Sequence, residues 1–201
     1  MPVTRRHFLA ASAALAAGPL AVGGVAVSWW NQPPQAPLRH LSATEIAFFD
    51  ALADAIFPPG GTPALSGRDA GVCRYIDQVL QGMAETQRDL LRLALHALDS
   101  LAWEQAGATL PELAARPAPG SGSPGVTRPG GPEAVADVLR GWLTAGDGNL
   151  RGLAQSLHIF VGMAYLAHPD VSPTVADQFG CGFGLSPGST VDAWVDGGHA
   201  Q

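Results

Sequence analysis

Between Leu41 and Pro169 the apolar residues recur at intervals of three and four, in segments that Pro- and Gly-rich breaks separate. This spacing gives a helix one apolar stripe, and no stretch shows the period of two that a half-buried strand requires. The pattern therefore predicts an all-α domain, a small helical bundle of about five to six helices around one core. After Pro169 the chain is too rich in Gly and Pro for another long helix and predicts a Gly/Pro-rich C-terminal tail.

Two capping patterns indicate where helices begin. Ser42 with Glu45, and Thr109 with Glu112, have the spacing of a capping box, in which each side chain bonds to the other residue's backbone N–H. Pro132 suits the first turn of a helix. The expected helices cover 43–57, 70–81, 86–106, 110–115, 132–145 and 150–168.

Other boundaries and faces follow from single residues. Asp69 and Asn149 are expected to cap the second and the last helix, and Gly107 is expected to end the third. The last helix is the most apolar, so we expect it to be the central one. The third helix is predicted to bury five residues, namely Leu90, Leu91, Ala94, Leu98 and Leu101.

The N-terminus has the order of an export signal. Arg5 and Arg6 are followed by Phe8 and Leu9 and then by an apolar run without charge. A cationic pair before such a run is typical of a bacterial twin-arginine signal, and a buried core helix would instead show a polar face. Whether the signal is cut stays open, because Trp29 and Trp30 could also hold the chain at a membrane interface.

The chain accordingly divides into three parts. Residues 1–30 are expected to be a twin-arginine signal or possible anchor, and residues 31–40 a Pro-rich linker. Residues 41–201 are expected to form the helical domain, with a flexible insertion at 116–132 where Pro, Gly and Ser interrupt the periodicity.

Composition limits the partners. The chain of 201 residues is 47% hydrophobic and 14% charged. All seventeen carboxylates follow residue 40 and two of the eleven arginines lie in the signal, which leaves a net charge of −8 on the rest. Nucleic acid and anionic lipid are unfavourable partners for such a surface. The shortage of charge suits an apolar patch that a partner covers.

The sequence contains no dinucleotide or phosphate loop, no CxxC or CxxCH and no HExxH, so we expect no catalytic, cofactor-binding or metal-binding residue. His158 lies on an apolar helix with no carboxylate or histidine three or four residues away. We therefore interpret it as a core or interface histidine, and the alternative is a catalytic base. Asp50 and Asp54 could suggest a metal, although a solvated polar face accounts for the pair better.

The two cysteines differ in setting. Cys73 lies on an apolar stripe, where a thiol behaves as a small hydrophobe, whereas Cys181 lies in the glycine-rich stretch FGCGFG. In an oxidising compartment three outcomes are open. These are a Cys73–Cys181 bridge, an intersubunit bridge from Cys181, and no disulfide.

Several short motifs occur along the domain. They are Leu52, Asp54, Ile56 and Pro58 at a helix end, the Thr62-Pro63 turn, a helix with Ala70, Gly71, Val72, Tyr75, Ile76, Asp77 and Leu80, and a late segment at 164–171. With the twin-arginine pattern, these motifs resemble the gluconate 2-dehydrogenase subunit 3 family, the small or gamma subunits of membrane-associated FAD-dependent sugar and polyol dehydrogenases. The resemblance is strong over 41–82 and loose elsewhere.

The resemblance implies a non-catalytic small subunit that escorts a flavoprotein through twin-arginine export and stabilises it. It further implies FAD in that dehydrogenase subunit, a multihaem cytochrome c subunit in the same complex, the twin-arginine translocase as a partner, and a periplasmic location. The alternative function is a free-standing periplasmic or membrane-tethered helical binding module.

Overall fold

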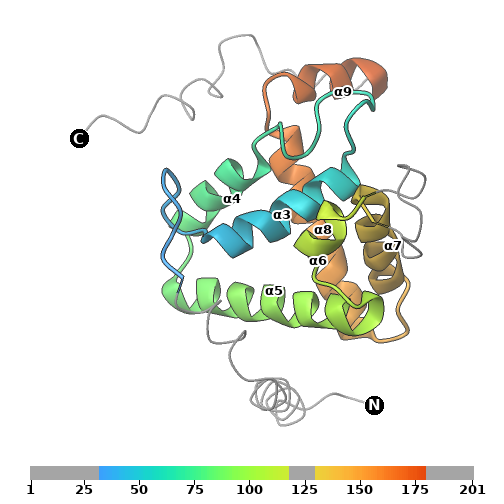
Figure 1. Cartoon of the computed structure of the whole chain (residues 1–201). Helices are drawn as coiled ribbons and strands as arrows, with labels where there is room; N and C mark the ends of the chain where they lie inside the picture. Colours follow the sequence, from blue (N-terminus) through green and yellow to red (C-terminus); the bar gives the residue numbers. More distant parts are fainter. Residues whose placement is uncertain (1–31, 118–129, 180–201) are drawn as a thin grey trace.

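The computed structural model describes residues 32–117 and 130–179. Its helices, shown in Figure 1, are α3 (Ala43–Ile56), α4 (Val72–Gln81), α5 (Glu85–Ala106), α6 (Leu110–Ala115), α7 (Pro132–Leu143), α8 (Gly148–Leu166) and α9 (Val171–Phe179). The all-α prediction is confirmed, since the extended pairing within these ranges is one isolated bridge between Pro34 and Ser42. The described helices number one more than expected, because α9 forms a short helix where the tail was predicted to begin.

Helix α3 lies at the centre of the bundle and contacts α4, α5, α6, α7 and α8. Phe48, Phe49 and Leu52 on this helix are completely buried, and the two phenylalanine rings pack edge to face at 5.8 Å. A helix that is apolar around most of its circumference is stable only inside a core. The prediction that the last long helix would be central is therefore wrong.

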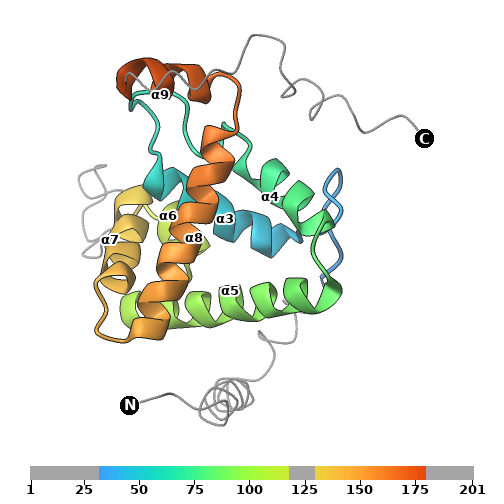
Figure 2. The ribbon, with the colours of Figure 1, turned by 180° about the vertical axis from the view of Figure 1, so that it is seen from behind.

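The other helices surround α3. Figures 1 and 2 show α5 along one side of the bundle, α8 crossing the rear face, and α6 and α7 together at one end. The indole N–H of Trp142 on α7 donates to Gln105 Oε1 on α5 at 3.0 Å. At the far end of α8, Tyr165 stacks on Phe57 with ring centroids 3.8 Å apart and donates its hydroxyl to the Leu65 carbonyl at 2.8 Å.

Several predicted helix ends are confirmed. Both capping boxes form, at Ser42 and at Thr109, and α7 begins with Pro132. Gly107 ends α5 in the left-handed conformation, with φ of 68°, which a glycine adopts without steric cost.

Two predicted N-caps are wrong. Asp69 bonds instead to Ser66, from whose hydroxyl it accepts at 3.0 Å, and this turn precedes the helix, so that α4 begins only after Gly71. Helix α8 is capped by Asp147, whose carboxylate accepts from the N–H groups of Asn149 and Leu150. In both cases a short polar side chain finds a partner within three residues, and sequence spacing does not tell which turn continues as a helix.

The predicted inward face of α5 is only partly correct. Leu98 is buried, but Leu90 is exposed, and Leu95 and Ala102 belong to the core instead. Leucines spread over more than half of the circumference of this helix, so which of them reach the core depends on where α3 and α6 lie.

The insertion predicted at 116–132 falls mostly in residues 118–129, outside the described ranges, but its two ends meet. The Gly131 N–H donates to the Leu113 carbonyl at 2.9 Å. A Cβ atom added to Gly130 would lie 2.4 Å from the Cβ atom of Arg116. The two ends of the insertion thus lie together, beside the end of α6.

Candidate functional site

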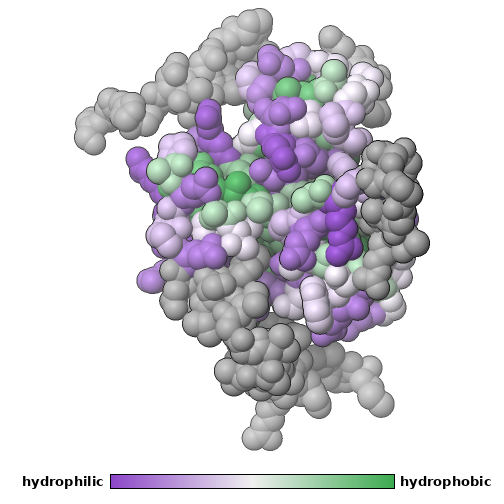
Figure 3. Space-filling view, in the orientation of Figure 1, coloured by the Kyte–Doolittle hydropathy of each residue, from purple (hydrophilic) through white to green (hydrophobic). Residues whose placement is uncertain are grey.

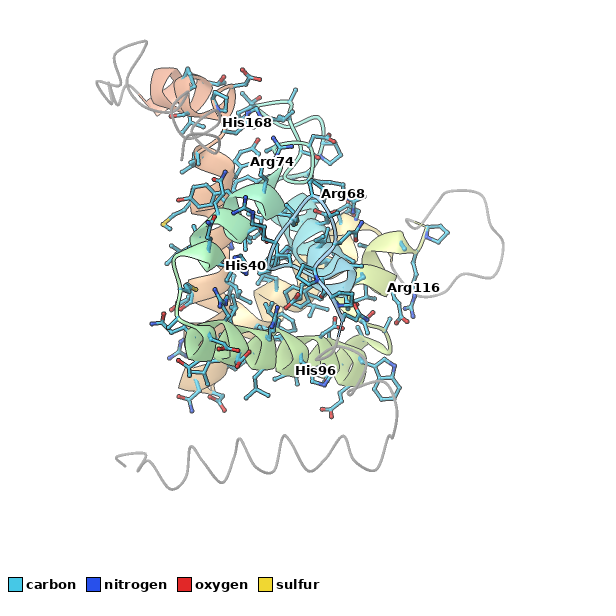
Figure 4. The ribbon with its side chains drawn as sticks, turned by 90° about the vertical axis from the view of Figure 1, so that its left-hand side faces the viewer. His40, Arg68, Arg74, His96, Arg116 and His168 are labelled. Atoms are coloured by element: carbon cyan, nitrogen blue, oxygen red, sulfur yellow. The ribbon has the colours of Figure 1, made fainter. Side chains whose placement is uncertain are left out.

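The residues ahead of α3 fold back on the domain, although residues 31–40 were predicted to be a linker. The Gln35 N–H donates to the Leu41 carbonyl at 2.9 Å, beside the bridge of Pro34 with Ser42. The Thr44 hydroxyl donates to Gln32 Oε1 at 2.6 Å. We call residues 32–42 the N-terminal clasp, and Figure 4 views the molecule from this side.

Asp77 on α4 holds the clasp by its backbone. Its carboxylate accepts hydrogen bonds from the N–H groups of Arg39, His40 and Leu41 at 3.0, 2.7 and 3.0 Å. The Asp77 side chain is buried, so these three donors replace the water that a carboxylate otherwise binds. A carboxylate that accepts three backbone N–H groups fixes the path of the segment that supplies them.

Glu45 and Arg92 hold the clasp from α3 and α5. The buried Glu45 carboxylate accepts from the Ser42 backbone N–H at 2.7 Å and from Arg92 Nε at 3.0 Å. Arg92 Nη2 donates to the His40 carbonyl at 2.9 Å. Figure 4 shows His40 between α4 and α5. Three helices therefore meet on the clasp, which directly follows the segment with the export pattern.

Sequence reasoning missed this site, although one signal was present. Asp77 lies among Cys73, Ile76 and Leu80, which form the buried stripe of α4. A carboxylate inside an apolar stripe needs a partner, and this indicates a polar contact without naming it. Arg92 gave no comparable signal, because arginines are common on exposed helix faces.

A second polar cluster joins α3 to the loop that precedes α4. Arg68 Nε lies 3.5 Å from Asp50 Oδ2 and 3.4 Å from Asp54 Oδ2, and the Arg68 N–H donates to Asp54 Oδ1 at 3.0 Å. The carboxylate pair that could have suggested a metal is therefore bridged by a guanidinium. Among the described residues no group of three or more His, Cys, Asp or Glu side chains is placed to hold a metal ion.

Cys73 belongs to this cluster and is a free, buried thiol. Its Sγ donates to Asp50 Oδ1 at 3.2 Å. Burial and the neighbouring Asp50 raise the pKa of the Cys73 thiol, and burial raises the pKa of Asp50. A thiol with a raised pKa is a poor nucleophile, so Cys73 acts as a packing residue. Cys181 lies outside the described residues, and the disulfide alternatives that include it stay predictions.

Asp99 is a third buried carboxylate that the sequence did not indicate. It accepts a hydrogen bond from the Leu110 N–H at 2.9 Å and so holds the start of α6 on α5. Burial raises the pKa of Asp99 from 3.8 to about 6, the Leu110 hydrogen bond lowers it, and Glu112 raises it slightly.

The histidines on α5, on α8 and just beyond α8 lie in different settings. His158 was expected in the core or an interface, and its side chain is exposed on α8. The His168 ring accepts from the Asp170 N–H at 3.2 Å, an arrangement local to the end of α8. Burial lowers the pKa of His96.

An open, shallow groove is lined by residues 61–65 with Asp170 and Thr174.

The residues of the export signal, namely Arg5, Arg6, Phe8 and Leu9, lie outside the described ranges. Of the helices that the structure does describe, none combines the length and the apolar character needed to cross a bilayer. The clasp is thus the part of the domain nearest in sequence to the signal.

Comparison with protein families gave a match for the part of the chain that holds the clasp. Residues 43–117, from the start of α3 to just beyond α6, match the family model described as gluconate 2-dehydrogenase subunit 3. Residues 43–117 belong to the gluconate 2-dehydrogenase subunit 3 family. Neither curated protein sequences nor solved structures gave a match.

The gluconate 2-dehydrogenase subunit 3 region supplies the three charged side chains that hold the clasp, Glu45, Asp77 and Arg92. It also contains the helix motifs on which the resemblance rested, and the resemblance is confirmed. Helices α7, α8 and α9 lie beyond the match. The description of the family names a subunit of a dehydrogenase, and this agrees with an accessory role for this chain.

Proposed function

We propose that this chain is the non-catalytic small subunit of a dehydrogenase complex. In this role it escorts an FAD-dependent sugar, gluconate or polyol dehydrogenase subunit through twin-arginine export and stabilises it. The observation that carries the proposal is the family match over residues 43–117, which covers α3 to α6. The arginine pair ahead of an apolar run supports the export role.

The clasp suits a subunit that carries an export address for a partner. Residues 39–42 are bonded to side chains of α3, α4 and α5, so a force applied at the N-terminus is passed to the middle of the bundle. A free linker would leave the signal loosely tethered to its cargo. The clasp instead joins the signal to the folded domain within a few residues.

The proposed complex has three further components. The flavoprotein subunit binds the FAD and holds the active site, and a multihaem cytochrome c subunit receives the electrons. The twin-arginine translocase recognises Arg5 and Arg6. The assembled complex lies in the periplasm, associated with the membrane through its other subunits or through an uncut signal.

Substitution of both signal arginines tests the proposal. Arg5→Lys with Arg6→Lys keeps the charge and removes the twin-arginine address, so this chain and the flavoprotein should both stay in the cytoplasm. We expect periplasmic sugar or polyol dehydrogenase activity to fall at least tenfold. Arg140→Lys, at an exposed arginine of α7, is the matched control and should export normally.

Normal periplasmic activity in the double variant would contradict the escort role. Sugar oxidation that survives deletion of the whole chain would favour the free-standing binding module instead. Fractionation of both proteins by immunoblot separates a failure of export from a failure of assembly.

A further inference from the structure

Helix α8 exposes a row of large apolar side chains. Ile159, Met163 and Leu166 lie at spacings of four and three, which places them on one side of a helix, and they are 61%, 49% and 46% exposed. Among the described residues only two other large apolar side chains are comparably exposed, Leu90 and Trp103, both on α5. We call the row of three the α8 ridge.

The ridge belongs to a surface with few charges. Helix α8 has nineteen residues and a single charged one, Arg151, whereas α5 has six in twenty-two. The neighbouring helix α4, which packs beside α8 in Figure 2, has one exposed charge, Arg74, because Asp77 is buried in the clasp. Neither helix exposes a carboxylate, although the protein is acidic.

The bundle does not use the ridge itself. The opposite side of α8 packs into the core through Ala154, Leu157, Val161 and Ala164, all of them buried. The face shown in Figure 3, which lies on the other side of the molecule from α8, has hydrophilic residues on both sides of an apolar band over α3. An apolar row with polar residues around it is typical of the centre of a protein interface, where charges are depleted and Met is enriched.

From these observations we propose that the α8 ridge is the surface on which the catalytic subunit of the dehydrogenase docks. The inference rests on the proposed function, which supplies the partner. The charges beside the ridge indicate what the surface of the catalytic subunit should be like. It should carry an apolar strip with a neutral or acidic rim, because Arg74 and Arg151 would lie against that rim.

The area of the ridge favours a larger partner over a second copy of this chain. A helix of nineteen residues is about 28 Å long and about 10 Å wide, so its outer face covers on the order of 300 Å². A stable interface buries about 800 Å² on each partner. Two α8 helices packed on each other would fall well short. A second copy that also covered α4 would bring the Arg74 and Arg151 side chains of both copies to one interface, whereas a large subunit with a neutral or acidic rim can cover α8 and α4 without this repulsion.

The position of the ridge leaves the export segment free. In Figure 2, α8 crosses the face toward the viewer and the clasp lies at the edge beyond α4. The chain can therefore be held by a partner at α8 while its N-terminus leaves from the clasp. An escort subunit needs both contacts at the same time.

The test compares two equally exposed apolar residues. Ile159 and Leu90 are both 61% exposed, so Ile159→Glu and Leu90→Glu introduce the same charge at the same exposure. Each full-length variant is tagged at the C-terminus and purified from host membranes, and bound flavin is measured per mole of tagged protein. Ile159→Glu should lower that ratio at least tenfold, whereas Leu90→Glu should leave it within twofold.

Each result has one meaning. A loss in Ile159→Glu with retention in Leu90→Glu supports docking at the ridge. Flavoprotein retained by both variants overturns the ridge and leaves the proposed function standing. A wild-type chain that purifies without a flavin-containing dehydrogenase overturns both. A wild-type dimer in light scattering that Ile159→Glu dissociates assigns the ridge to a second copy and overturns the proposal.

A second variant guards against misfolding. Circular dichroism and thermal melting establish whether Ile159→Glu folds like the wild type. If Ile159→Glu does not fold like the wild type, the double variant Arg74→Glu with Arg151→Glu decides, since both side chains are exposed. The same thermal melting checks that loss of the hydrogen bond from Arg151 to the Ala145 carbonyl leaves the fold intact. This pair should weaken flavoprotein retention severalfold, more so at low salt, and unchanged retention would count against the ridge.

Discussion

Three buried carboxylates, Glu45, Asp77 and Asp99, are each bonded to backbone N–H groups of a neighbouring segment. Such bonds fix the path of the chain segments that supply the N–H groups. The backbone partner of Glu45 is 3 residues away in sequence, those of Asp77 are 36 to 38 residues away, and that of Asp99 is 11 residues away. Only the nearest, within the capping box, could be predicted from spacing, because the other two depend on how helices pack.

Asp99 makes stability depend on pH. Burial raises its folded-state pKa from 3.8 to about 6, so the native state binds the proton more tightly than the unfolded state. Its contribution is therefore greatest below about pH 4 and is lost as pH rises toward 6. Asp99→Asn keeps an acceptor oxygen for Leu110 without a charge, and should be more stable than wild type by roughly 1–3 kcal/mol at pH 7.

Urea denaturation from pH 4 to pH 7 measures this effect. The difference between Asp99→Asn and wild type should shrink as the pH approaches 4. A difference that is constant over this range would show that Asp99 has the same pKa in the folded and unfolded states.

Among the helices, starts with a local chemical cause could be predicted, and packing faces could not. The capping boxes at Ser42 and Thr109 and the proline at 132 act within one turn, so sequence alone identifies them. Leu90 was placed in the core and is exposed, because α5 has leucines on several sides and the choice among them depends on neighbouring helices. The order of helices was therefore predictable and the identity of the central one was not.

The clasp connects three helices, so its loss should lower the stability of the whole domain and not only of the clasp residues. Asp77→Ala leaves three backbone N–H groups without their acceptor, one of them on the buried residue Leu41. We expect the free energy of unfolding to fall by about 2–4 kcal/mol. Urea denaturation checks this, and hydrogen exchange at residues 39–41 should show the loss of protection directly.

Asp89→Ala is the control for this experiment. Asp89 on α5 is half-exposed and lies 3.8 Å from Arg92, so its removal should cost less than about 0.5 kcal/mol. If Asp77→Ala is as mild as Asp89→Ala, the clasp is held by its other contacts and Asp77 is dispensable.

For the molecule as a whole, the sequence predicted the fold class and the family, but it did not predict which helix faces are left uncovered on the surface. A helix rich in Leu, Ala and Gly has the same pattern whether its second face meets its own core or another subunit. The α8 helix was therefore expected at the centre, and only the packing of α3 shows that one side of α8 remains uncovered. The clasp was missed for a similar reason, since proline-rich polar sequence is usual in free linkers.

The insertion should be separable from the bundle. Arg116 and Gly130 lie side by side, and Gly131 is bonded to Leu113, so the two ends are joined without residues 118–129. Replacing 118–129 with a Gly-Ser pair should change the free energy of unfolding by less than about 1 kcal/mol, because shortening a loop has a small entropic effect. A cooperative thermal unfolding transition at the wild-type temperature would confirm this, and loss of cooperativity would show that the insertion helps to form the core.

The clasp also sets an order of events during synthesis. Arg92 lies 52 residues after His40, to whose carbonyl it donates, so the bond cannot form until the ribosome has made the first third of α5. At about 5–20 residues per second, that takes roughly 3–10 seconds after His40 is added. During this interval other proteins in the cell can bind the N-terminal segment, because the hydrogen bond that ties the clasp to α5 has not yet formed.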